Sequence, residues 1–171
     1  MNLTQTLNAF DEALNEFFEK DCDLLHRDIS ERSITHKIAE YLGKRFTDFH
    51  TDCEYNGDMY NRKELGIDKY EMIALAVRKI DKDDTYAIFP DIIIHKRKSN
   101  KNNHLVIEVK KKNGNYKEKQ FDIVKLKKLT TQYKYRLGIY LELKTGENCQ
   151  VSEIKYFQTG NELNRNNLAE L

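Results

Sequence analysis

Near the start of the chain, apolar residues recur every three or four positions, which is the spacing of one face of a helix. This stripe consists of Leu3, Leu7, Phe10, Leu14 and Phe17. It predicts an amphipathic helix over residues 2–20. The helix belongs to an N-terminal segment, residues 1–22, that is expected to pack on the protein core or on a partner.

Two more helices are expected further along the chain. The first begins near Asp28 or Ser30, either of which can cap it, and ends at about residue 46. Its apolar face is formed by Ile34, Ile38, Leu42 and Phe46. The other helix covers residues 117–132, a segment without Gly or Pro that is rich in Lys, Glu and Leu and therefore helical by propensity.

Alternating or continuous apolar runs predict five strands in the rest of the chain. They cover residues 51–56, 87–95, 104–111, 137–143 and 150–157. The polar segment 96–103 has the composition of a hairpin turn between the second and third strands. Residues 57–85 fit no single pattern and are treated as an insertion, in which residues 70–77 could form a short helix or a strand. The tail after Gly160 is expected to be a short helix or frayed.

The order of these elements, α-α-β-β-β-α-β-β, predicts an α/β protein with a central mixed β-sheet flanked by helices. With 171 residues, of which 39% are apolar, the chain suits one domain with a single core. We find no secretion signal and no run of about 20 apolar residues, so no membrane partner is expected. Cys22, Cys53 and Cys149 lack the paired spacing of a zinc site and are interpreted as reduced thiols of a cytoplasmic protein.

The formal net charge of +1 conceals a strong asymmetry along the chain. Residues 96–136 contain 14 Lys and Arg against three acidic residues, which gives +11, so the other 130 residues, with 15 basic and 25 acidic, carry −10. A basic surface of this size would attract polyanions such as nucleic acids. A solvated lysine-rich helix explains the charge pattern more simply when it is taken alone. The position of this region beside a candidate carboxylate site favours the first interpretation.

The most informative residues are Asp91, at the start of one predicted strand, and Glu108 and Lys110, at the end of the next. Side chains alternate along a strand, so Glu108 and Lys110 share one face of the sheet. If the hairpin pairs symmetrically about its turn, Ile93 faces Val106 and Asp91 faces Glu108. Opposite residues of an antiparallel pair have Cβ atoms about 4.5–5.5 Å apart, close enough for two carboxylates to share a cation.

These three side chains have the chemistry of a metal-dependent phosphodiesterase. Two adjacent carboxylates repel each other unless a proton or a cation is bound between them. Mg²⁺ prefers a few carboxylate oxygens together with water and phosphate oxygens, and Mn²⁺ can substitute for it. Lys110 cannot bind the metal as an ammonium, but it can hold the attacking water or stabilise the charge that develops on the phosphate.

Pro90-Asp91, followed 17 residues later by Glu108-Val-Lys110, resembles the signature of the PD-(D/E)XK nuclease superfamily. This superfamily includes restriction endonucleases, junction resolvases and repair nucleases. The order of helices and strands over residues 28–157 is also similar to that of the superfamily. The resemblance therefore implies a restriction-endonuclease-like core within a single nuclease-like domain.

The resemblance also implies roles for individual residues. Asp91 and Glu108 would bind Mg²⁺ together with the backbone carbonyl of Val109, and Lys110 would serve the nucleophilic water. Members of the superfamily often supply another acid from the helix that precedes the motif strands. In this chain the matching candidate is Glu31.

The sequence offers two explanations of Glu31 and favours neither. It projects beside the apolar face of its helix and could point into the site, but Asp28-x-x-Glu31 also has the spacing of a capping box. His36 lies on the opposite side of this helix and is expected at the surface. Asp52 and Glu54 share the polar side of their strand, where either could contribute to the metal site, although an exposed strand acid is the simpler explanation.

Basic residues around the motif are candidates for binding the nucleic acid backbone. They are Lys111, Lys112, Lys125 and Lys128. Lys125 could also reach the site as an accessory residue, although an ordinary basic surface position is favoured. His95 and His104 lie about 13 Å along the strands from Asp91 and Glu108, so they cannot bind the same ion and are expected at a solvated hairpin tip.

The sequence therefore predicts a Mg²⁺-dependent nuclease that hydrolyses phosphodiester bonds by a metal-activated water, with DNA favoured over RNA as the substrate. The competing class is a non-catalytic nucleic-acid-binding or protein-interaction module on the same scaffold. A third candidate is a homodimer, or a small subunit whose N-terminal helix docks on a larger partner that provides target recognition. The joint presence of Asp91, Glu108 and Lys110 favours the enzyme.

Overall fold

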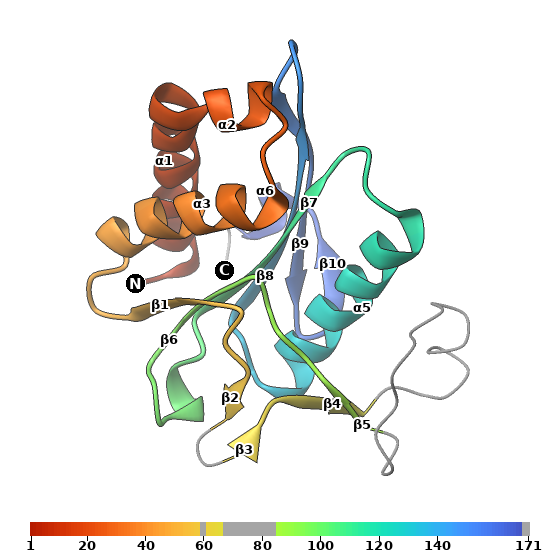
Figure 1. The fold of residues 1–171 in the computed structure, drawn as a ribbon. Coiled ribbons are helices and arrows are strands. Elements are labelled where there is room, and N and C mark those ends of the chain that lie inside the picture. The colour runs from red at the N-terminus through yellow and green to blue at the C-terminus, as the bar shows by residue number, and fades with distance from the viewer. Residues whose placement is uncertain (59–60, 67–84, 169–171) are drawn as a thin grey trace.

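The computed structural model describes residues 1–58, 61–66 and 85–168 of the chain. Six strands form one mixed sheet in the order β1-β6-β7-β8-β9-β10. Their bounds are β1 His50–Cys53, β6 Ile92–His95, β7 Leu105–Lys111, β8 Leu137–Lys144, β9 Gln150–Gln158 and β10 Asn161–Leu163. Within this sheet β7 and β8 run parallel, and the other neighbouring pairs are antiparallel. The helix α5, Tyr116–Gln132, connects the parallel pair across one face of the sheet (Figure 1).

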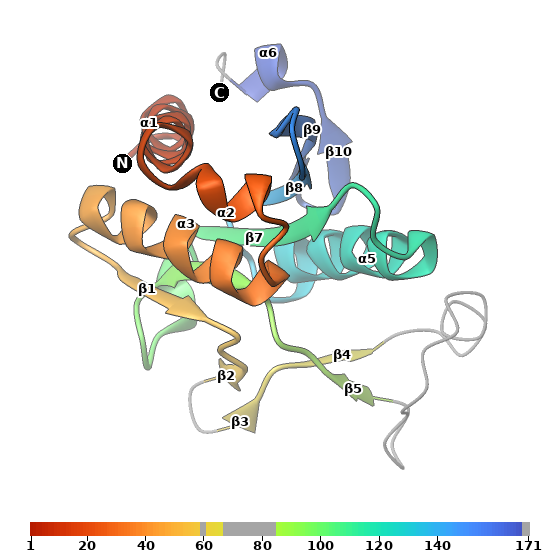
Figure 2. The same ribbon diagram turned by 45° about the horizontal axis from the view of Figure 1, so that its top comes forward.

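Helices cover both faces of the sheet, with α5 alone on one side and the remaining described helices on the other (Figure 2). Those remaining helices are α1 Leu3–Asp21, α2 Asp23–His26, α3 Glu31–Arg45 and α6 Arg165–Leu168. Among the helices that the structure describes, none combines the length and the apolar character that a membrane span requires. The molecule is thus an α/β protein with a six-stranded mixed sheet between two helical layers.

The alternation of side chains along β6 and β7 divides the apolar core into two layers. The layer beneath α1 and α3 contains Ile92, Ile94, Leu105, Ile107 and Val109 of these strands. The layer beneath α5 contains Ile93 and Val106, which pack with Leu126 and Leu129. Burying an aliphatic side chain of this size stabilises a fold by about 1.5–3 kcal/mol, so a shift by one residue, which would exchange the two layers, is strongly disfavoured.

The predicted pairing of the motif strands is confirmed. Ile93 lies opposite Val106, with Ile92 opposite Ile107 on one side and Ile94 opposite Leu105 on the other. The turn between the strands contains a single 3₁₀ turn, Asn100–Asn102. The symmetric register expected from the sequence therefore places the residue before β6 beside the centre of β7.

The first motif strand is shorter than expected. It begins at Ile92, whereas the sequence predicted residue 87, because Thr85–Ala87 forms a separate strand, β5, that pairs with β4, Glu64–Gly66. Pro90 lies between the two strands and has no backbone N–H to contribute to a ladder. The chain therefore changes partners at this point, and Asp91 lies in a bend directly before β6.

Other boundaries also differ from the expectations. β1 ends at Cys53, before the predicted residue 56, and the following Glu54 has a positive φ of 48°, which breaks the extended conformation. The described part of the insertion forms a small hairpin, β2 Gly57–Asp58 with β3 Asn61–Arg62, and supplies β4 and β5. Residues 70–77 lie outside the described residues. The tail after Gly160 forms β10 before the short helix α6 begins.

The N-terminal stripe is buried in the protein's own core. Its five residues are between 0% and 6% exposed, and they pack with α3 and with the apolar face of the sheet. Asn2 and Gln5 close the start of α1 with a reciprocal capping box. The stripe therefore packs on the protein's own core, which is the first of the two alternatives that the sequence left open, and the apolar face of α1 is not available to another subunit.

The two histidines of the motif hairpin are buried, so the expected solvated hairpin tip is wrong. His95 is 4% exposed and His104 is 6% exposed. His104 Nε2 lies 2.9 Å from Thr6 Oγ1 of α1, and its ring stacks on Phe49 with the ring centroids 4.5 Å apart. His95 Nε2 lies 2.9 Å from Asp52 Oδ2. The strand β1 and helix α1 cover this end of the hairpin, which the composition of the turn could not indicate.

Candidate active site

A group of acidic and basic side chains, most of them buried, lies next to the first residue of β6, Ile92, beyond which β7 no longer pairs with β6. Glu108, in the middle of β7, is fully buried, and it lies beside Tyr140 of the parallel strand β8. Because β6 begins at Ile92, the N–H of Val109 donates a hydrogen bond of 2.8 Å to Asp91 Oδ2. The loop before β6 therefore brings the Asp91 carboxylate to the edge of β7, beside Glu108.

The helix α5 adds two residues to this group from one side of the sheet. Lys125 Nζ lies 2.7 Å from Glu108 Oε2 and 3.0 Å from Asp122 Oδ1. The side chains of Lys125 and Asp122 are only 9% and 6% exposed. The interpretation of Lys125 as a surface residue is therefore wrong. The apolar stripe that starts at Leu126 extends back by one turn, so the residues before it also face the sheet.

The helix α3 adds Glu31 from the other side. Glu31 Oε1 accepts a hydrogen bond of 2.8 Å from Lys110 Nζ, and its Oε2 accepts one of 3.0 Å from the N–H of Lys111. The cap of this helix is Ser30, whose side chain accepts from the N–H of Ser33. Asp28 has a positive φ of 51° and instead pairs with the Lys111 ammonium. The capping explanation of Glu31 is therefore wrong, and Glu31 lies in the group.

The charges of this group do not balance. Its members are Glu31, Asp91, Glu108, Lys110, Asp122 and Lys125. Four carboxylates and two ammonium groups leave a net charge of −2 when all six are ionised. Among the described residues, Glu108 Oε1 is a fully buried oxygen that has no hydrogen-bond partner. Buried carboxylate oxygens normally have such a partner, so this atom and the charge imbalance together indicate room for a cation.

Burial raises the pKa of two carboxyl groups in this group, those of Glu108 and Asp91. It raises the pKa of Glu108 well above its ordinary range, and Asp91 and Asp122 add to this effect, while Lys125 opposes it. Burial also raises the pKa of Asp91, against the opposing charges of Lys125 and Lys110. Without a cation, Glu108 and Asp91 are therefore the carboxyl groups that would bind a proton.

The two lysines of the group are held in the charged form. Burial alone would lower the pKa of Lys110, but Asp122, Glu31 and Asp91 together raise it above its ordinary value. The pKa of Lys125 is raised in the same way, because Glu108, Asp122 and Asp91 outweigh the effect of burial. The positive charges of the site are therefore fixed, and its negative charge depends on protons or cations.

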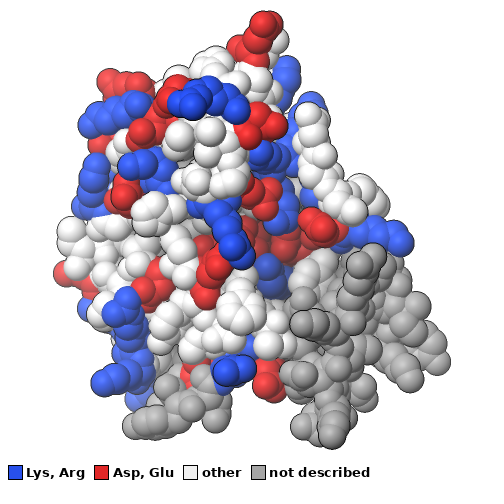
Figure 3. All heavy atoms as spheres, viewed as in Figure 1, with Lys and Arg blue, Asp and Glu red and all other residues white. Residues whose placement is uncertain are grey.

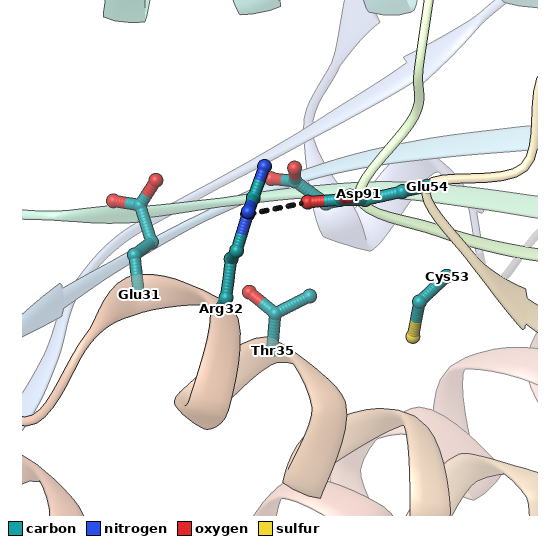
Figure 4. Close-up of a pocket in the computed structure, with 6 residues that line it drawn as sticks. All are labelled: Glu31, Arg32, Thr35, Cys53, Glu54 and Asp91. Atoms are coloured by element: carbon teal, nitrogen blue, oxygen red, sulfur yellow. Dashed lines mark ion pairs between the residues drawn. The ribbon is translucent and has the colours of Figure 1, made fainter.

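A cavity of about 290 Å³ gives access to this group from solvent. It is lined by Glu31, Arg32, Thr35, Cys53, Glu54 and Asp91 (Figure 4). Arg32 rises from α3 beside Glu31 and pairs with Glu54 Oε1 at 2.8 Å, with its own side chain 84% exposed. Asp91 and Glu31 therefore meet the solvent directly, while Glu108 lies in the interior.

Two residues of the site were not predicted. Asp122 precedes Leu126 by one helical turn, so the apolar period of α5 could have placed it facing the sheet. Arg32 follows Glu31 directly, and nothing in its spacing distinguishes it from other arginines. The spacing of Asp122 from Leu126 was thus visible in the sequence. The high lysine content of this helix instead favoured the interpretation that these residues face solvent.

The remaining candidates lie outside the group. Asp52 pairs with Arg97 as well as with His95, and His36 is exposed and pairs with Glu40. Lys111 binds Asp28. Lys119, which was not among the candidates, lies near the start of α5, with its Nζ 2.6 Å from Glu142 Oε2. Lys112 is exposed and Lys128 is half-buried.

The expected concentrated basic surface is not found on the face seen in Figure 3. Blue and red side chains alternate over this face and do not form one positive region. The reason is that lysines from the basic part of the sequence pair with acids from other parts, such as Asp28 with Lys111 and Glu31 with Lys110. Charge that is concentrated in the sequence is thus distributed and partly neutralised in the fold.

Comparisons of the chain with protein-family models, with curated proteins and with solved structures find no significant match. The class of the protein therefore rests on its own fold and site. It is an α/β protein in which a mixed six-stranded sheet, one loop and two helices enclose a cluster of four carboxylates and two lysines.

Proposed function

We propose that this protein is a metal-dependent nuclease with a restriction-endonuclease-like core, which hydrolyses phosphodiester bonds in DNA. The observation that carries the proposal is the meeting of Asp91, Glu108 and Lys110 behind a cavity that Asp91 and Glu31 line, in a cluster with a net charge of −2 when all six groups are ionised. A cluster that serves only to stabilise the fold would have to neutralise this charge with protons on Glu108 and Asp91, because unpaired buried charge is destabilising.

The residues of the cluster fit a hard divalent cation such as Mg²⁺ or Mn²⁺. Asp91, Glu108 and the carbonyl of Val109 would hold it, since oxygen ligands are what these ions prefer. The unpartnered Oε1 of Glu108 supports this assignment. When bound, such an ion lowers the pKa of a coordinated water and polarises the phosphoryl group.

Lys110 is the residue assigned to the reacting groups. Its ammonium lies 2.8 Å from Glu31 Oε1 and 3.4 Å from Asp122 Oδ2, and these two carboxylates hold it charged and in one position. A fixed ammonium can hold the attacking water or stabilise negative charge on the phosphate without reorganising during the reaction. In this proposal Glu31 and Asp122 are positioning residues, because they act through Lys110.

Arg32 is assigned to binding of the nucleic acid backbone. It lies at the mouth of the cavity beside Glu31, and its guanidinium is largely exposed although it pairs with Glu54. An exposed pair of this kind contributes at most about 1 kcal/mol, so a phosphate can replace Glu54 as its partner. The proposed approach of the substrate is therefore from the α3 side of the sheet.

One observation favours a second candidate function, a nucleic-acid-binding module without catalysis. Lys125 Nζ already lies between Glu108 and Asp122, where it partly neutralises Glu108, a carboxylate that the nuclease proposal assigns to a cation. In this alternative the buried ion pairs serve the fold, and Arg32 with the exposed Lys112 binds phosphates.

The two functions are separated by incubating the protein with supercoiled plasmid, single-stranded DNA and RNA, in Mg²⁺, Mn²⁺ or EDTA. We expect cleavage of DNA that requires the divalent ion and falls by at least about 100-fold in Asp91→Asn, Glu108→Gln and Lys110→Met. The matched controls are Asp48→Asn, Glu19→Gln and Lys20→Met, which change exposed side chains away from the cluster.

Cleavage that persists in EDTA, or that is equal in the site variants and their controls, would refute the mechanism. DNA binding without cleavage, unchanged by EDTA and weakened by Arg32→Ala, would establish the second candidate. Cleavage of RNA but not of DNA would support the metal-dependent hydrolysis and would show that the substrate is RNA.

A further inference from the structure

A second group of side chains with metal-binding chemistry lies where α1, α2 and the turn between β8 and β9 meet. It consists of Cys22, His26 and Cys149, and one ligand atom from each lies within 4.8 Å of the other two. The sequence interpretation treated the cysteines as scattered thiols because their spacing resembles no zinc motif. The fold brings two of the three together with a histidine that is 123 positions from Cys149.

The local geometry of the three residues suits a tetrahedral site. Cys22 and His26 are four positions apart over a single helical turn, so their side chains point to the same side. His26 Nε2 lies 3.3 Å from Cys149 Sγ. A tetrahedral zinc ion with ordinary bond lengths to sulfur and imidazole nitrogen separates these two atoms by about 3.5 Å, so little movement is needed to bind one.

The ring of His26 is oriented by the turn that carries Cys149. His26 Nδ1 lies 3.1 Å from the carbonyl oxygen of Gly146, to which it can donate when Nδ1 is protonated. This arrangement leaves a lone pair on Nε2 toward the two thiols, and such a backbone partner is typical of histidines that bind metals. The N–H of Gly146 also donates to the carbonyl of Leu25 at 3.0 Å, so the turn is tied to α2 at two points.

We propose that Cys22, His26 and Cys149 form a binding site for a thiophilic divalent cation, Zn²⁺ in the first instance, with one coordination position open to solvent. Two thiolates and an imidazole select such a cation over Mg²⁺, which prefers oxygen ligands, so this site is separate from the carboxylate cluster. The two cysteines are half-buried and His26 is exposed, which leaves the open position on the solvent side. On binding, the two thiols release their protons to the solvent.

The site would join two distant parts of the chain. Leu25, between the ligands of α2, is fully buried, and Asp28 two residues beyond His26 pairs with Lys111 of β7. A cation at this point therefore fixes the segment that leads into α3, on which Glu31 is placed. The role is a structural one, and it does not depend on whether the carboxylate cluster cleaves nucleic acid.

The test uses the full-length protein without a histidine tag, reduced and freed of metal by a chelator, and titrated with Co²⁺ and then with Zn²⁺. We expect one thiolate-bound Co²⁺ per chain, measured by a thiolate-to-cobalt charge-transfer band that saturates at one equivalent and that Zn²⁺ abolishes by displacement. Cobalt bound by carboxylates gives no such band. Cys22→Ser and Cys149→Ser, each of which keeps one thiol, should weaken the band, and these two variants and His26→Ala should bind Co²⁺ at least about 100-fold more weakly, because loss of even an outer-shell partner weakens metal binding by 10–100-fold.

The matched controls are Cys53→Ser and His36→Ala, which should keep wild-type affinity. A second readout uses wild-type protein only, so it does not depend on the folding of variants. Zn²⁺ should protect Cys22 and Cys149, but not Cys53, from alkylation detected by peptide mass spectrometry. Absence of the charge-transfer band, equal loss in Cys53→Ser, or equal alkylation of all three cysteines with and without Zn²⁺ would each overturn the proposal. So would a Cys22–Cys149 disulfide that, once reduced, gives no metal uptake.

Discussion

Replacing Lys125 with methionine tests whether the buried charges of the carboxylate cluster stabilise one another. Methionine keeps most of the length and apolar character of the lysine stem and removes only the ammonium. Lys125 Nζ is 2.7 Å from Glu108 and 3.0 Å from Asp122, and the Glu108 side chain is 0% exposed. With the carboxyl groups ionised, the substitution changes the net charge of the cluster from −2 to −3, in a region with little water to screen it, so the variant must take up protons or lose stability.

The expected loss of stability is large. Removing one partner of a buried ion pair typically lowers the free energy of unfolding by about 3–5 kcal/mol. For a chain of 171 residues this corresponds to a decrease in Tm of about 6–20 °C. The control Lys127→Met, on the exposed side of the same helix, should change the free energy by no more than about 0.5 kcal/mol.

The loss of stability in Lys125→Met should depend on pH, because Lys125 affects the pKa of Glu108. Lys125 has a raised pKa in the folded state, so its own contribution is present at all pH values below the ordinary lysine range. Its loss raises the pKa of Glu108 further, so the folded variant retains a proton that the unfolded chain releases above pH ~4.5. Between the pKa of Glu108 in the folded wild type, which burial already raises, and its still higher pKa in the folded variant, the stability of the variant relative to wild type should therefore fall as pH rises, by up to about 1.4 kcal/mol per pH unit for one proton.

The assay is urea unfolding monitored by circular dichroism in EDTA, at pH ~5 and at pH ~8. It compares the wild type, Lys125→Met, Glu108→Gln and the double variant. The double variant should lose less stability than the sum of the single variants, by about 1 kcal/mol or more, because the two residues interact. Additive effects within about 0.5 kcal/mol, or a Lys125→Met loss that is no larger at pH ~8 than at pH ~5, would refute the reasoning.

Two further predictions concern buried polar groups outside the cluster. Asp52→Asn should lower the free energy of unfolding at pH ~7 by about 1–3 kcal/mol, since hydrogen bonds from Arg97 and His95 hold the pKa of Asp52 below its ordinary value although burial raises it. This contribution is present above pH ~4 and is lost as pH falls, so urea unfolding at pH ~3 should show a much smaller difference, and equal stabilities at pH ~7 would contradict the assignment. Tyr135→Phe should leave the Tm unchanged or raise it, because the Tyr135 hydroxyl is buried and has no hydrogen-bond partner among the described residues. A clear decrease in Tm on calorimetry would show that the hydroxyl has a partner.

The sequence predicted the hairpin of the motif because its information is local. The apolar alternation of β6 and β7 and the symmetric turn between them determine the register, and the register determines that Asp91 lies beside Glu108. The extent of β6 was not predicted, because it depends on where the preceding residues pair. Thr85–Ala87 pairs with a strand from the insertion, which no pattern in the hairpin itself could indicate.

The positions of the charged residues were predicted less well, since charge patterns along a chain do not specify partners. Lys125 and Asp122 belong to a helix whose composition is typical of a solvated surface, yet the packing of Leu126 and Leu129 turns both toward the sheet. The grouping of Cys22 with Cys149 depends on contacts between segments more than 100 residues apart. Such groupings follow from the topology of the sheet, which local spacing does not encode.

The helix α5 is held to the sheet in different ways along its length, and this has a consequence for its local opening. Its first part is attached by the ion pairs of Lys119 with Glu142, Asp122 with Lys110 and Lys125 with Glu108, and the apolar contacts there come from the partly buried Phe121 and Ile123, whereas the fully buried Leu126 and Leu129 anchor the rest of the helix in the apolar core. Segments with few apolar contacts open at a lower free energy than the core does. We therefore expect the first two turns of α5 to separate from β7 while the sheet stays intact. The frequency of that opening, and not the global stability, would then determine how fast protons and ions exchange at the innermost carboxylate.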